Sequence, residues 1–96
     1  MFALVSIGQV EPGKLDEVVR FVSETTLLNG VPGFKRYDFL IDRVQNKTLA
    51  MTVFESQAEL DAFRASPAVR DVYAVVTPLY IAGTLERGVW EVVVQK

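Results

Sequence analysis

The sequence predicts an α+β protein with a ferredoxin-like sheet, in which a split βαβ arrangement places the helices on one face. The expected elements follow the order strand, helix, two strands, helical segment and two strands. The helical stretches repeat apolar residues at three- and four-residue spacing, whereas strand stretches alternate them or run continuously apolar. Half of the 96 residues are hydrophobic, which is enough for one domain spanning residues 1–96.

The first two expected elements are a strand and a helix. Residues 2–10 alternate in a way that places Leu4 and Ser6 on one face of a strand. The stretch "EPGK" ends this strand, and Pro12 suits the first turn of a helix. Helical spacing of leucine and valine continues from there, and Asn29-Gly30 is a plausible left-handed stop.

The middle of the chain predicts a hairpin followed by two short helices. A Pro-Gly turn in "VPGF" precedes a second strand over residues 34–44. The stretch "DRVQNK" then turns the chain into a third strand over residues 48–55. Residues 56–66 and 67–76 predict two helical segments, the second beginning at a proline.

Two further strands are expected at the end of the chain. Residues 79–86 predict a fourth strand, and Arg87-Gly88 is interpreted as a break. The valine-rich "VWEVVVQ" predicts a fifth strand. This strand either extends the same sheet or crosses to a second copy of the chain, and the sequence leaves both alternatives open.

Several predicted strands are apolar on both faces. In the third strand Leu49, Met51 and Val53 alternate with Ala50 and Phe54. Helices on one face of a sheet leave the other face uncovered, and that face is normally polar in a monomer. We therefore expect a two-fold homodimer that packs sheet on sheet; a covering ligand or a wrapped tail are the alternatives.

Composition excludes several classes of function. The net charge is −2 and no basic run occurs, so nucleic-acid and anionic-membrane binding are disfavoured. The chain has no cysteine or histidine, which removes thiolate nucleophiles, Ser-His-Asp triads and histidine ligation of zinc or haem. No acidic spacing indicates a metal site and no glycine-rich phosphate loop occurs, so no cofactor is expected. The N-terminal stretch resembles no signal peptide and no apolar run could span a membrane, so we expect a cytoplasmic protein.

Three motifs together resemble a known family. They are "PGK.DE" after the first strand, "VPGF" before the second, and "VFES.AELDAF..SP" after the third. The chain resembles the antibiotic biosynthesis monooxygenase family of dimeric α/β-barrel proteins over residues 3–82. The resemblance implies a ferredoxin-like subunit, a homodimer and a pocket inside each subunit. The family includes cofactor-free oxygenases of phenolic and quinol-like substrates, haem-degrading enzymes, and members with no known reaction.

The resemblance also implies where functional residues would lie. Cofactor-free oxygenases of this family carry a Trp, an Asn and a Tyr at positions that match Phe54, Ala50 and Leu60 here. None of the three polar groups is retained. The implied pocket is therefore apolar, and it could hold an aromatic ligand without hydrogen-bonding it through these positions.

Haem-degrading members carry an Asn, a Trp and a haem-ligating His at positions that match Ser6, Phe63 and Tyr73. A tyrosinate can ligate haem iron. The joint loss of all three residues nevertheless makes haem degradation the disfavoured alternative.

Other polar residues each have a structural and a functional interpretation. Ser56 and Glu59 form the spacing of a helix capping box, which explains Ser56 without nucleophilic chemistry. Glu55 is suited to the same helix N-terminus. Arg36 shares a strand face with Asp38 and Asp42, and these side chains form either an interface ion-pair set or the polar end of a pocket.

We expect a small aromatic ligand to bind in the pocket implied by the resemblance. Tyr73 is the best candidate for a catalytic hydrogen-bond donor, although core packing explains it equally simply, and Arg36 and Glu55 rank behind it. The sequence leaves two functions open: a cofactor-independent oxygenase, and a non-catalytic small-molecule-binding or stress-associated dimer. The expected pocket-lining residues are Phe54, Leu60, Phe63, Ala50 and Ser6.

Overall fold

The computed structural model describes residues 1–96 and has four strands, three α-helices and one 3-10 turn. In chain order the elements are β1 (Phe2–Gln9), α1 (Leu15–Glu24), β2 (Phe34–Asp42), β3 (Lys47–Phe54), α2 (Gln57–Arg64), α3 (Pro67–Val76), the 3-10 turn η1 (Thr77–Leu79) and β4 (Glu86–Glu91).

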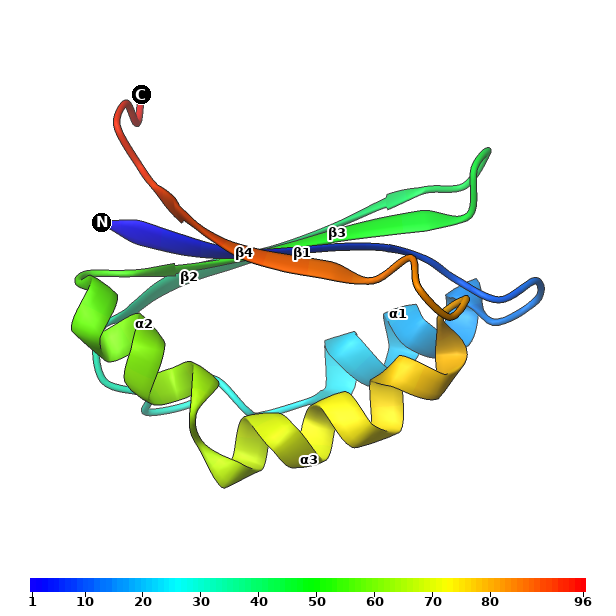
Figure 1. Ribbon diagram of the computed structural model, residues 1–96, viewed down its shortest axis with the longest axis horizontal. Helices are drawn as coiled ribbons and strands as arrows, with labels where there is room; N and C mark the ends of the chain where they lie inside the picture. Colours follow the sequence, from blue (N-terminus) through cyan, green and yellow to red (C-terminus); the bar gives the residue numbers. More distant parts are fainter.

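The four strands form one antiparallel sheet in the order β2-β3-β1-β4. All three helices lie on the same side of this sheet, as Figure 1 shows. This arrangement confirms the predicted ferredoxin-like α+β fold. No helix is long and apolar enough to cross a membrane.

The prediction of a fourth strand over residues 79–86 is wrong. The chain leaves α3 through η1, and Tyr80 then makes only an isolated bridge to Val10. A turn follows, in which the Thr84 amide donates to the Ile81 carbonyl at 3.2 Å and Gly83 adopts a positive φ of 83°. Tyr80, Leu79 and Leu85 of this stretch pack in the hydrophobic cluster at this end of the layer instead of pairing along a strand.

The predicted break at Arg87-Gly88 lies inside β4, which pairs with β1 over its whole length. The predicted fifth strand is thus the C-terminal half of the sheet's fourth strand. Beyond Glu91, only the Val92 amide continues the pairing, donating to the Met1 carbonyl at 2.9 Å.

Helix α1 also ends earlier than predicted, at Glu24 rather than near Asn29. Thr25 leaves the helix in an extended conformation, and residues 25–33 continue as turns. Gly30 does adopt the left-handed φ that the sequence indicates, at 72°, but it does so within these turns. The shorter helix leaves this segment free to border the space between helices and sheet.

Helices α2 and α3 begin at serine caps. The Glu59 amide donates to the Ser56 hydroxyl at 3.2 Å, so the predicted serine cap is present. The Glu59 carboxylate reaches back to the Ser56 hydroxyl, which donates to it at 2.9 Å, rather than to the Ser56 amide. The Val69 amide donates to the Ser66 hydroxyl at 3.3 Å, and a proline follows this cap. These caps fix where each helix starts along the sheet.

Two hydrophobic clusters fill the layer between helices and sheet. The first lies under α2 and contains Leu4, Phe54, Leu60, Phe63 and Val69. The second lies at the opposite end and contains Val10, Leu15, Val18 and Tyr80. Tyr80 reaches the sheet because β1 has a glycine there: a Cβ on Gly8 would lie 2.7 Å from the Tyr80 ring.

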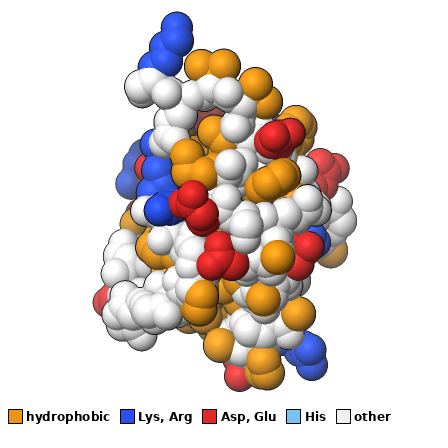
Figure 2. Space-filling view, turned by 90° about the vertical axis from the view of Figure 1, so that its left-hand side faces the viewer, with side chains coloured by type: hydrophobic (Ala, Val, Ile, Leu, Met, Phe, Trp, Pro, Cys, Tyr) orange, Lys and Arg blue, Asp and Glu red, His pale blue; other side chains and the backbone are white.

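The face of the sheet opposite the helices carries apolar side chains in contact with solvent. Trp90 is 64% exposed, Leu40 52% and Ile7 42%. The register places Leu40 and Ile7 on either side of the half-buried Leu49, and Trp90 beside Ala3. Figure 2 shows hydrophobic side chains at the upper end of the molecule, near the C-terminus, on the side without helices.

Candidate functional site

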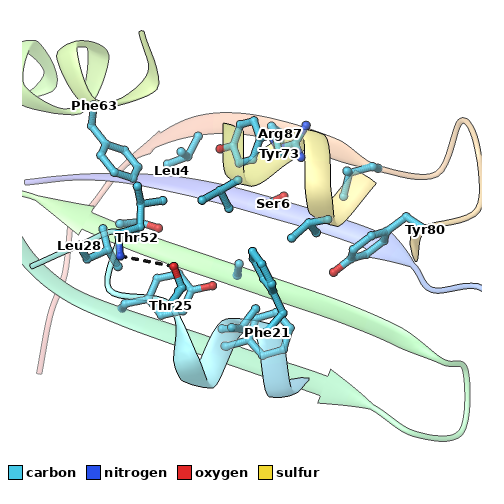
Figure 3. Close-up of a pocket in the computed structure, with 18 of the residues that line it drawn as sticks. Leu4, Ser6, Phe21, Thr25, Leu28, Thr52, Phe63, Tyr73, Tyr80 and Arg87 are labelled. Atoms are coloured by element: carbon cyan, nitrogen blue, oxygen red, sulfur yellow. Dashed lines mark hydrogen bonds between the residues drawn. The ribbon is translucent and has the colours of Figure 1, made fainter. Parts of the chain in front are cut away.

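A cavity of about 190 Å³ lies between the sheet and helices α1 and α3. Its floor comes from the helix-facing side of the sheet, and residues of the 25–29 segment close one side (Figure 3). Fourteen of its nineteen lining residues are hydrophobic. The lining set is Leu4, Ser6, Phe21, Val22, Thr25, Leu27, Leu28, Asn29, Tyr37, Phe39, Ala50, Thr52, Phe63, Val72, Tyr73, Val76, Tyr80, Leu85 and Arg87.

Four of the six residues expected at the site from the sequence lie on the wall of this cavity: Ser6, Ala50, Phe63 and Tyr73. Ser6 and Ala50 are direct neighbours in the β1–β3 pairing, so they form adjoining parts of the floor. Figure 3 shows Phe63 and Tyr73 reaching the cavity from α2 and α3.

The other two expected residues, Phe54 and Leu60, are not part of the cavity wall. Both are 0% exposed and belong to the cluster under α2. The Phe54 ring packs against Phe63 with 5.1 Å between ring centroids and against Phe34 with 6.2 Å. The Phe54 and Leu60 side chains fill the core between α2 and the sheet. They pack in one cluster with Phe63, which does line the cavity, but they do not line it themselves.

Arg87 is the only charged residue that lines the cavity. It was not identified from the sequence as a site residue, because Arg87-Gly88 was interpreted as a break between strands. It projects from β4 toward the helices, with its guanidinium carbon 3.8 Å from the Tyr73 ring centroid. Its Nε is buried without a hydrogen-bond partner. The alternation of Arg87 with the half-buried Val89 in "ERGVWE" is the signal that could have found it.

The arginine lacks an acidic partner, since no Asp or Glu lines the cavity. Arg87 is half-buried, and burying its Nε without a hydrogen-bond partner is costly unless something else satisfies the group. The Tyr73 ring provides part of that compensation through a cation–π contact. The remaining N–H groups are suited to a bound anion.

Three tyrosines add hydroxyl groups around the cavity. Burial, followed by the neighbouring Tyr80 and Tyr73, raises the pKa of Tyr37 to about 12. Burial also raises the pKa of Tyr80, whose hydroxyl lies 2.6 Å from the Thr48 hydroxyl. Tyr37 and Tyr80 are therefore neutral at physiological pH and are poor proton acceptors. The Tyr37 hydroxyl can donate a hydrogen bond to a ligand, whereas the Tyr80 hydroxyl is engaged with Thr48.

The other polar candidates lie away from the cavity. Glu55 pairs with Lys35 at 2.7 Å on the surface, and this hydrogen-bonded lysine lowers the pKa of Glu55. Arg36 binds Asp38 at 2.7 Å on the face of the sheet without helices. Asp42 accepts the Val44 and Gln45 amides in the hairpin turn.

The arrangement suits binding of an aromatic anion. Apolar walls enclose the ring, one guanidinium favours a negative oxygen, and neutral hydroxyls donate hydrogen bonds. No group of three or more acidic residues that could hold a metal ion occurs in the structure. The lining offers no histidine or carboxylate that could accept a proton near neutral pH.

The sequence model of the antibiotic biosynthesis monooxygenase family matches residues 1–75 of the chain. No curated protein sequence matches it. The fold is similar to that of many solved structures, which include the following three.

A Deinococcus radiodurans protein named as an antibiotic biosynthesis monooxygenase superposes with a TM-score of 0.81 at 13% identity, over 100% of this chain and 96% of that one. A Chloroflexus aurantiacus protein with the same family name gives 0.75 at 22% identity, over 99% and 95%. A variant of SnoaB, a cofactor-independent oxygenase from Streptomyces nogalater, gives 0.76 at 20% identity, over 98% and 94%.

Proposed function

We propose that this chain, which belongs to the antibiotic biosynthesis monooxygenase family, is a cofactor-independent oxygenase. Its substrate would be a small ionisable aromatic compound such as a phenol or quinol. The observation that carries this proposal is Arg87, a guanidinium with a buried, unpartnered Nε in an otherwise apolar cavity. The likeness to the fold of SnoaB supports the same class of reaction.

The size of the cavity supports a small substrate. An apolar cavity of about 150 Å³ can hold benzene in another protein. The 190 Å³ present here therefore suits a ring system of one or two rings. A larger polycyclic substrate would require the 25–29 segment or α3 to move.

The chemistry would rest on the substrate anion. An electron-rich phenolate or quinolate can pass an electron to oxygen, after which the two radicals combine and one oxygen atom is retained on the ring. In the hydroperoxide that results after proton uptake, the O–O bond breaks as the same ring carbon loses its C–H proton. This releases the other oxygen atom as water and leaves a carbonyl on the ring, so the ring supplies all the electrons. Arg87 would favour the ionised substrate by binding its negative oxygen, because a nearby cation lowers the pKa of an acid.

Proton transfer within the cavity has few candidates. Tyr73 is the proposed catalytic hydrogen-bond donor, since it lines the cavity and its ring lies against Arg87. Burial holds Tyr37 neutral, so its hydroxyl would donate a hydrogen bond rather than accept a proton, and the Tyr80 hydroxyl is already engaged with Thr48. The proton released by the substrate would then leave to solvent rather than to a general base of the lining.

We also propose that the chain forms a homodimer through the face of the sheet without helices. This face exposes Trp90, Leu40 and Ile7, and the apolar Val93 and Val94 follow β4 with 83% and 71% exposure. Burying such a surface against a second copy is the usual solution for an apolar sheet face. Light scattering at micromolar concentration should give the mass of two chains, and a monomer would contradict the proposal.

Oxygen uptake tests the oxygenase proposal. We expect 1,4-dihydroxynaphthalene to consume oxygen faster with the protein than in buffer, and an Arg87→Met variant to lose at least about tenfold of that rate. A Tyr73→Phe variant as active as the wild type would remove Tyr73 from the mechanism. Saturable binding of the same ligand without any enhanced uptake would instead favour the second function, a non-catalytic small-molecule-binding dimer, which the burial of Phe54 and Leu60 away from the cavity also favours.

A further inference from the structure

We infer that Tyr37 is a specificity-determining residue that hydrogen-bonds a second ring oxygen, on the side of the cavity opposite Arg87. The ligand would be an aromatic ring with two oxygens on opposite carbons, one of them ionised. This inference rests on the proposed binding of an aromatic anion by Arg87.

The sheet holds Tyr37 and Arg87 on opposite edges. Tyr37 lies on β2 and pairs with Thr52, whereas Arg87 lies on β4 and pairs with Ser6. Two strands, β3 and β1, separate them. Strands are about 4.8 Å apart, and Tyr37 lies in the row of Leu4, two residues along β1 from the row of Ser6 and Arg87, so the two backbones are roughly 16 Å from each other.

Both side chains nevertheless line the same cavity. Each therefore extends inward over the floor that lies between the two strands. Figure 3 shows Arg87 and Tyr73 on one side of this space and Thr25 on the other. The cavity thus has a cationic end at the β4 edge and a hydroxyl-bearing end at the β2 edge, with apolar walls between them.

Of the three tyrosines, Tyr37 is the one whose hydroxyl is available at the far end. The Tyr80 hydroxyl is engaged at 2.6 Å with Thr48. The Tyr73 ring lies under the Arg87 guanidinium and so belongs to the cationic end. Tyr37 has no such partner, and its hydroxyl stays protonated well above neutral pH because of its burial.

A neutral donor that is mostly buried discriminates between ligands. A ring with an acceptor oxygen at that end satisfies the hydroxyl, whereas a ring with a methyl group there leaves it unpaired. The net value of one such bond corresponds to about a three- to tenfold difference in affinity. Tyr37 would thereby select dioxygenated rings over rings of the same shape with one oxygen.

Calorimetric titration under argon tests this inference without turnover. The two ligands are 1,4-dihydroxynaphthalene and 4-methyl-1-naphthol, which have nearly the same shape and differ in the oxygen at one end. We expect the wild-type protein to bind the diol about three- to tenfold more tightly. A Tyr37→Phe variant should bind both ligands with equal affinity, and its affinity for 4-methyl-1-naphthol should not fall.

The matched control is Tyr80→Phe, because the Tyr80 hydroxyl is already bound to Thr48 and is not free for a ligand. Its ratio of affinities should equal that of the wild type, whatever happens to its stability. An unchanged ratio in Tyr37→Phe, or no preference in the wild-type protein, overturns the inference. The outcome is separate from the oxygenase proposal: diol preference without oxygen uptake refutes only the reaction, and uptake with an unaltered ratio refutes only the role of Tyr37.

Discussion

The layer between helices and sheet is solid at one end and hollow in the middle. Under α2, Phe54, Leu60 and Val69 are at most 1% exposed and pack in one hydrophobic cluster. Between α1 and α3 the same sheet borders a cavity with an unpaired Arg87 Nε. The solid end optimises packing, whereas the hollow region leaves polar groups without protein partners. Under the proposed function, the close-packed end would supply stability and the hollow region would bind the ligand.

The largest effect on stability is expected from shortening a buried side chain in the cluster under α2. Leu60→Ala removes a fully buried side chain that neighbours cannot replace, so the free energy of unfolding should fall by about 2–5 kcal/mol. Urea unfolding at fixed protein concentration measures this loss. A loss below about 1 kcal/mol would mean that this end is not close-packed.

A matched pair on α3 tests the contrast directly. Val69 is 1% exposed in the cluster under α2, whereas Val72 lines the cavity. Val69→Ala should cost about 2 kcal/mol, because it opens a new void, and Val72→Ala about 1 kcal/mol or less, because it enlarges an existing one. Equal losses in thermal or urea unfolding would show that the two regions do not differ in packing.

Alkaline pH should destabilise the hollow region through Tyr37. The folded state raises the pKa of this phenol from 10.0 to about 12. Below pH 10 both folded and unfolded chains keep the proton, so stability is unaffected; between pH 10 and 12 the unfolded chain ionises first, and stability falls as pH rises.

The expected loss over that range is on the order of 1–2 kcal/mol, reduced from the full linkage value because Tyr37 is partly exposed. Urea unfolding at pH 9 and pH 11.5 measures it. A Tyr37→Phe variant serves as the control and should lose less stability over the same interval. The same loss in both proteins would assign the effect to other groups.

The smallest effect on stability is expected from filling the cavity. Ala50→Leu adds a side chain to the floor of the cavity, so the free energy of unfolding should change by less than about 1 kcal/mol. Affinity for 1,4-dihydroxynaphthalene should nevertheless fall at least about tenfold, since the added atoms occupy the volume that the ring needs. Retained affinity would place the ligand elsewhere.

Local signals in the sequence predicted much of the fold. The Ser56–Glu59 spacing located the start of α2, and the alternation placed Leu4 and Ser6 on one face of β1, which in the structure is the face toward the helices. Two predictions of where elements begin or end were wrong. Residues 79–86 have strand-like composition, yet a 3-10 turn and a glycine with positive φ divert them. Helix α1 stops at Glu24 because its continuation packs as turns beside the cavity.

The candidate site was harder to predict from the sequence than the fold. Tyr73 was the candidate donor from the sequence, and it does line the cavity, but Arg87 was taken as part of a break and no role was assigned to Tyr37. Both residues acquire their significance from strands that are distant in the chain. Composition gives no measure of whether an apolar layer closes completely or leaves a void.

The sequence by itself determined the order of elements, the helix starts and the apolar character of both sheet faces, because capping and periodicity act between residues close in the chain. Tertiary structure alone decided that Phe54 and Leu60 close one end of the layer while Tyr37 and Arg87 face a shared cavity from opposite edges. The physical reason is that a cavity depends on the summed shapes of side chains from several elements, and such long-range packing is not encoded in any single stretch.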